Sequence, residues 1–107
     1  MQAAIARAAT GLVGAIQGSF VAFEGVQVEE LRSRGWASAT FAGARHELRF
    51  TVEGEGAEEA AKNFLAGLEA AEFELPGHIV ADIALRSEER RPGFARIALE
   101  ALTVEDG

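Results

Sequence analysis

The chain has 107 residues, of which 49% are apolar and 25% charged, so residues 1–107 are expected to form one globular domain rather than a disordered segment. The net charge of −7 argues against binding to nucleic acid or to anionic membranes, because both depend on lysine and arginine side chains. The absence of cysteine excludes disulfides, thiol nucleophiles and cysteine-ligated metal centres.

The N-terminal segment, residues 2–17, has the composition of a helix. Ile5, Ala8, Leu12 and Ile16 fall on one face at helical spacing, and the opposite face has few strongly polar side chains. A helix that is apolar nearly all round needs burial on both sides, which favours a second subunit as a cover. The segment has neither the unbroken apolar length of a membrane span nor the charged start of a secretory signal, so a cytoplasmic location is expected.

Three strands are expected before the central helix. Alternating apolar and polar residues predict strands over 26–29, 36–42 and 46–53, separated by turns at 32–35 and 43–45. The third of these strands alternates strictly, which is typical of a strand with one wet face.

A helix is predicted over 57–71, where apolar residues recur every three or four positions. Strands follow over 79–85 and 94–104, joined by a charged hairpin loop at 88–93. The apolar phase of the last strand changes near Glu100, which predicts a bulge there or a strand covered on both faces.

These elements predict an α+β fold in the order α-β-β-β-α-β-β. Five strands and two helices favour an antiparallel or mixed sheet with the helices packed on it.

The two histidines define one candidate polar site. His46 and His78 each stand at the start of an expected strand, and with Asp82 they would form an acid-base or metal site if the sheet brought them together. Their spacing matches no local metal-ligand motif, and the alternative is that both rings bond to nearby turn carbonyls. We therefore expect no metal.

The charged hairpin defines a candidate interaction surface of four arginines and one aromatic residue. These are Arg86, Arg90, Arg91, Phe94 and Arg96. Two glutamates in the same loop, Glu88 and Glu89, offset part of the positive charge, so a protein contact is favoured there over RNA.

Other catalytic signatures are missing from the sequence. Adjacent acidic pairs such as Glu58 and Glu59 point away from each other on a helix, so they make no acid-base dyad. Gly54 and Gly56 precede a helix, but the acidic residues around them would repel a phosphate. We therefore expect no catalytic residues, no cofactor and no enzymatic activity.

The order of motifs from residue 46 to residue 106 resembles the tail-terminator and tail-completion proteins of prophages and gene transfer agents. The motifs are His46-Glu47-Leu48, the helix with Ala61, Lys62, Leu65 and Leu68, then Gly77-His78-Ile79-Val80, Arg90-Arg91, and the stretch from Arg96-Ile97 to Val104-Glu105-Asp106. That family usually has a proline and a tyrosine in its first strand, whereas this chain has no tyrosine and no proline before Pro76. The resemblance implies a ring-forming structural protein without an active site, located in the virion.

Two functional hypotheses follow from these patterns. The first is a non-enzymatic protein that acts by forming homo-oligomers or by binding a protein partner. The alternative is a small-molecule binding module with a pocket between the sheet and the 57–71 helix, near Trp36, Phe50 and Phe64. An enzyme that uses either histidine is a third and weaker hypothesis.

Overall fold

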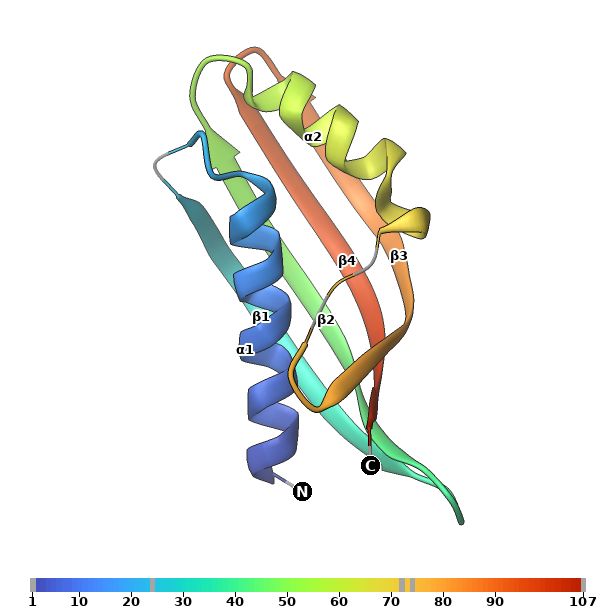
Figure 1. Cartoon of the computed structure of the whole chain (residues 1–107). Coiled ribbons are helices and arrows are strands. Elements are labelled where there is room, and N and C mark those ends of the chain that lie inside the picture. The colour runs from blue at the N-terminus through green and yellow to red at the C-terminus, as the bar shows by residue number, and fades with distance from the viewer. Residues whose placement is uncertain (1, 24, 72, 74, 107) are drawn as a thin grey trace.

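The computed structural model describes residues 2–23, 25–71, 73 and 75–106. Its elements along the chain are α1 (Gln2–Ser19), β1 (Val26–Ala37), β2 (Ala42–Glu53), α2 (Ala57–Ala66), the short 3₁₀ helix η1 (Leu68–Ala70), β3 (His78–Arg91) and β4 (Phe94–Glu105) (Figure 1). The predicted α+β class is confirmed, but the sheet has four strands rather than five.

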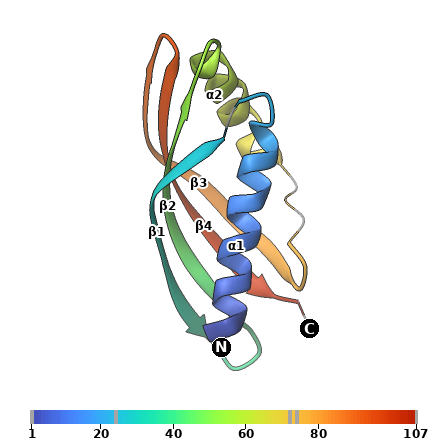
Figure 2. The same cartoon turned by 90° about the vertical axis from the view of Figure 1, so that its left-hand side faces the viewer.

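The four strands form one antiparallel sheet in the order β1-β2-β4-β3. Both helices lie on the same face of this sheet, with α1 over β1 and β2, and α2 nearest to β4 (Figure 2). In the described part of the chain no helix lies over the opposite face, which we call the open face. The molecule is elongated, measuring 47 × 23 × 22 Å.

Helix α1 buries its large side chains within the chain itself. The buried positions follow helical spacing: Ala4, Ala8, Ala9, Leu12 and Ile16. The outward positions are small or polar, among them Ala3, Arg7 and Gly14. The helix is therefore one-sided, and its outward face by itself does not require the second subunit that the sequence favours.

Helix α2 is shorter than the predicted segment 57–71. It begins after Gly56, which takes a left-handed conformation with φ of 84°, and it ends at Gly67, after which η1 makes a single tighter turn. Glu58 accepts a hydrogen bond at 3.1 Å from the backbone nitrogen of Gly93 in the β3–β4 turn. This bond ties the first turn of α2 to the end of the sheet.

Strand β1 contains the whole of the strand predicted at 26–29 but only the first two residues of the strand predicted at 36–42, since β1 ends at Ala37 and β2 begins at Ala42. The expected turn at 32–35 is wrong, because these four residues pair in order with positions 44–47 of β2. Instead, the chain turns at 38–41, where the backbone nitrogen of Ser38 donates to the carbonyl of Phe41 at 2.7 Å. A continuous partner strand outweighs the turn preference of a short Arg-Ser-Arg-Gly segment.

The turn expected at 43–45 is also wrong, because these residues belong to β2. Gly43 serves a close approach between strands: a Cβ at this position would lie 1.9 Å from the carbonyl oxygen of Thr103 and 3.0 Å from Cζ2 of Trp36. Only glycine fits between β4 and the indole ring at this distance.

The second hairpin is also longer than predicted. Strand β3 continues to Arg91, so that Pro92 and Gly93 alone form the turn, and Gly93 supplies the required positive φ of 75°.

The bulge expected in the last strand is absent, since β4 pairs with β2 without a shift. Leu102 and Val104 are half-buried on the open face, whereas Ala101 and Thr103 are buried under the helices.

All three register shifts of the sheet lie in its edge strands. One shift falls between Val28 and Glu30 of β1, and β3 has two, one after Val80 and one after Leu85. Bulged edge strands resist pairing with strands of another molecule. The free edges of this sheet are therefore poor docking sites.

The core lies between the sheet and the two helices. Four phenylalanines fill one end of it, and the ring centroids of Phe20 lie 5.9 Å from Phe50 and 5.1 Å from Phe64. Ile97 and Leu99 continue the core along β4 beneath the helices. Tilted aromatic packing of this kind stabilises a core beyond the burial of its area.

Candidate functional site

The structure brings part of the predicted hairpin set together on the open face. Phe94 is nearly buried there, although no helix covers it. The guanidinium carbon of Arg91 lies 4.0 Å from the centre of its ring, and that of Arg96 lies 5.2 Å away. Two cation–π contacts thus shield this aromatic ring from water.

The arginines of this hairpin are already paired with glutamates. Arg96 donates to Glu29 at 2.8 Å and to Glu89 at 3.0 Å, and Arg91 also pairs with Glu89. Arg90 pairs with Glu88 at 3.1 Å, and Arg86 lies 3.3 Å from Glu100. The hairpin therefore presents balanced charge rather than an open anion site.

One pKa shift follows from this network. Hydrogen bonding from Arg96 lowers the pKa of the Glu29 carboxyl below its ordinary value, because the bond and the positive charge favour the ionised form.

His46 lies within β2 rather than at its start, and its ring is buried between the sheet and α1. Its Nε2 lies 2.9 Å from the hydroxyl of Thr103, and its Nδ1 lies 2.7 Å from the hydroxyl of Ser33. Thr103 donates its own proton to the carbonyl of Ala44 at 3.3 Å, so it accepts from Nε2–H. Nδ1 therefore carries the lone pair and accepts from Ser33.

This arrangement holds His46 in its neutral form. Burial lowers the pKa of His46, and the nearby His78 lowers it further because two positive rings repel each other. Only 1% of the residue is exposed, and both ring nitrogens are occupied by hydrogen bonds. The hydrogen-bonding groups of the ring are therefore all used within the fold, and a substrate cannot reach them.

His78 and Asp82 are separated by the sheet. The Nδ1–H of His78 donates to the carbonyl of Pro76 at 3.1 Å, as expected for a ring that bonds to a turn carbonyl. Asp82 pairs with Leu102 on the open face, whereas His46 faces the helices. Among the described residues, no group of three histidine or acidic side chains is placed to hold a metal ion.

The aromatic residues expected to line a pocket are not together. Phe50 and Phe64 pack edge to face at 6.2 Å inside the core. Trp36 lies opposite Gly43, seven residues before Phe50 along β2, which is about 23 Å of strand. The phenylalanines therefore serve the core, and Trp36 belongs to another part of the molecule.

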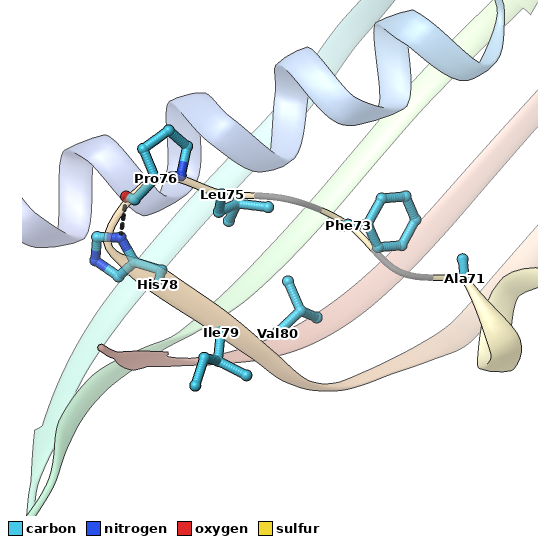
Figure 3. Close-up of a pocket in the computed structure, with 7 residues that line it drawn as sticks. All are labelled: Ala71, Phe73, Leu75, Pro76, His78, Ile79 and Val80. Atoms are coloured by element: carbon cyan, nitrogen blue, oxygen red, sulfur yellow. Dashed lines mark hydrogen bonds between the residues drawn. The ribbon is translucent and has the colours of Figure 1, made fainter. Parts of the chain in front are cut away.

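A hollow of about 560 Å³ lies between β3 and the chain segment that precedes it (Figure 3). Apolar side chains form most of its wall: Ala71, Phe73, Leu75, Pro76, Ile79 and Val80, with His78 at one side. Figure 3 shows Ile79 and Val80 on β3, with Phe73 and Leu75 on the segment that faces them. This hollow could hold an apolar group, but it offers few polar contacts for orienting one.

The sequence reading missed a second cluster on the open face, near the 38–41 hairpin. Arg32 and Arg34 of β1 point to this face together with Arg45 of β2, and we call these three residues the distal arginine cluster. Trp36 lies in the next row of the same face, and Phe41 at the hairpin tip is 60% exposed. The signal was present in the sequence, since positions 32, 34 and 36 alternate as in a strand, but the predicted turn at 32–35 concealed it.

Comparisons with protein-family models, with curated proteins and with solved structures found no match to this chain. None of the helices in the described part of the chain combines the length and the apolar composition that a membrane-spanning helix requires.

Proposed function

We propose that this protein is not an enzyme and acts by associating with proteins, foremost with further copies of itself. The observation that carries the proposal is an apolar row across the end of the open face. Trp36, Gly43, Val104 and Ile79 are neighbours across the four strands, and Ile79 is 53% exposed. Apolar and aromatic residues beside arginines are typical of the centre of a protein interface.

Two further features support the proposal. Both histidines are used in structural hydrogen bonds, which supports a role in association over one in acid-base catalysis by these two rings. The bulged edge strands disfavour assembly by strand pairing, so the open face is the better candidate.

The resemblance to tail-terminator proteins supports a particular kind of assembly. In this proposal the protein forms a ring on a phage-tail-like particle, and it occurs in the cytoplasm before assembly and in the virion afterwards. Nucleic acid and membranes are not its partners, in keeping with its net charge of −7.

Sedimentation velocity over a range of micromolar concentrations tests the proposal. We expect a species heavier than one chain, whose fraction grows with concentration, and rings in negative-stain electron micrographs. A single species with the mass of one chain at every concentration would contradict self-association.

The alternative of a small-molecule binding module is favoured by the apolar hollow beside β3. An apolar fluorescent dye such as anilinonaphthalene sulfonate would then bind with one-to-one stoichiometry. A Val80→Lys substitution would abolish that binding if the hollow is the site, while the mass in solution stays the same.

A further inference from the structure

The distal arginine cluster concentrates positive charge in an otherwise acidic chain. Arg34 and Arg45 lie directly opposite each other on neighbouring strands. Like charges in this position destabilise a sheet unless a negative group lies between or beside them. The side chains of Arg32 and Arg45 are 72% and 56% exposed, so the cluster is open to a partner.

Intramolecular ion pairs neutralise this cluster only in part. Arg32 pairs with Glu30 at 2.8 Å and with Glu47 at 3.3 Å, and Arg45 pairs with Glu100 at 2.7 Å. Arg34 has no ion-pair partner among the residues that the structure describes, unlike every other strand arginine. A hollow of about 440 Å³ lies against Arg32, Ser33, Arg34, Arg45 and Glu47.

The opposite end of the sheet has the complementary charge. Glu53, Glu55 and Glu59 surround the turn between β2 and α2, and none of them forms an ion pair with another described residue. We call these three residues the acidic turn. The turn also contains Gly54, which packs against the ring of Phe23, and Gly56, around which the space is open, so the exposed carboxylates project from a narrow backbone on the side of Gly56.

The two charged ends cannot neutralise each other within one molecule. Arg45 and Glu53 lie on the same strand, eight residues apart, which corresponds to about 26 Å. Salt screens exposed charges beyond about 8 Å at physiological ionic strength. The two ends of the sheet lie at opposite ends of the molecule in Figure 1, so only a second molecule can bring them into contact.

We propose that the acidic turn of one copy docks on the distal arginine cluster of the next copy, in a head-to-tail contact. The narrow turn suits the hollow beside Arg34, and its carboxylates would complete the charge pairing of the three arginines. Trp36 and the exposed Phe41 flank the contact with apolar surface, and the Trp36 Nε1–H lacks an acceptor among the described residues. Such a contact joins different surfaces of each copy, so it propagates into a ring or a filament.

This inference rests on the proposed self-association and names the two surfaces through which the copies would bind. The test compares the unmodified chain with Arg34→Glu and Glu55→Arg by sedimentation velocity, with Arg7→Glu on the outward face of α1 as a control for the charge change. We expect each of the first two substitutions to weaken association by about tenfold or more, and Arg7→Glu to leave it unchanged. Thermal melts followed by circular dichroism establish that all variants fold.

A mixture of the two variants tests directly whether the acidic turn binds the distal arginine cluster. The Arg34→Glu chain keeps an intact acidic turn, and the Glu55→Arg chain keeps an intact arginine cluster, so mixing them should restore heavy species that neither forms alone. The double variant, with the two charges exchanged, should also recover association.

The outcomes separate the two proposals. If the unmodified chain stays monomeric, self-association itself is wrong, and the head-to-tail contact with it. If the unmodified chain associates but Arg34→Glu and Glu55→Arg associate equally well, the contact is wrong and the proposed function stands. Association that is lost in both variants but not restored by mixing them would also overturn the contact.

Discussion

Gly43→Ala should strongly destabilise the fold, although it adds only one methyl group. The new Cβ would lie 1.9 Å from the carbonyl oxygen of Thr103, whereas such atoms stay at least 3.0 Å apart. The gap between β2 and β4 must therefore open by about 1 Å. These are the two central strands of the sheet, so neither can move away freely.

The magnitude follows from two contributions. Overpacking in a well-packed region costs about 1–3 kcal/mol, and weakening one ladder hydrogen bond costs about 1 kcal/mol more. We expect the free energy of unfolding to fall by about 2–4 kcal/mol. Urea unfolding followed by Trp36 fluorescence should then show a midpoint lower by about 1–3 M.

Gly14→Ala is the matched control. Gly14 lies on the exposed side of α1, and an added Cβ would meet nothing within 4 Å. Alanine favours a helix over glycine, so this variant should be more stable by about 0.5–1 kcal/mol. The reasoning is refuted if Gly43→Ala unfolds within about 0.5 kcal/mol of the unmodified chain.

Three further predictions concern the polar groups. Thr103→Val should lower the free energy of unfolding by about 1–3 kcal/mol, because it leaves the Nε2–H of the buried His46 without an acceptor. Thermal and urea unfolding would measure this loss, and an unchanged stability would contradict the assigned hydrogen bond. The lowered pKa of His46 means that its neutral form stabilises the fold fully above the unfolded value of about 6.5, and that this contribution is lost as pH falls through the folded pKa. Urea midpoints measured from neutral to mildly acidic pH should therefore fall more steeply for the unmodified chain than for His46→Gln, and equal slopes would refute the shift. The Glu29 carboxyl should titrate below its ordinary range by NMR and return toward that range in Arg96→Met, whereas an unchanged titration would show that Arg96 does not set it.

The alternation of residues 46–53 predicted both the strand and its buried face. Leu48, Phe50 and Val52 are in the core, and the alternate positions point to the open face. The helix at 2–17 was also predicted closely, because its apolar spacing is periodic over several turns. Long periodic segments can be predicted from their own residues, because the spacing of the apolar positions specifies both the type of element and its buried side.

The first hairpin was predicted incorrectly because its signals are local and weak. Arg32-Ser33-Arg34-Gly35 has the composition of a turn, yet it is held extended by pairing with β2. The first predicted strand therefore continues to Ala37, and residues 38–41 of the second predicted strand form the turn before β2, so the expected order loses one strand. The same pairing places Trp36 opposite Gly43 and therefore far from Phe50, so the pocket expected between the sheet and the helix does not form.

The candidate sites were predictable only in part. The Arg-rich hairpin was found from sequence, and Arg91, Phe94 and Arg96 do lie together. Asp82 was grouped with His78 because the predicted alternation places both on one face of the strand, but the register shift after Val80 puts Asp82 on the open face. A shift of one residue moves a side chain to the other side of a sheet, and sequence spacing does not reveal it.

The amino-acid pattern was enough to predict the α+β class, the two helices, the buried faces of β2 and α1, and the net acidity of the chain. Strand pairing in the folded chain sets the strand count, the face of each polar residue, and the opposed positions of the distal arginine cluster and the acidic turn. Periodicity is a property of neighbouring residues, whereas register and charge separation arise from pairing between strands that are distant in the chain.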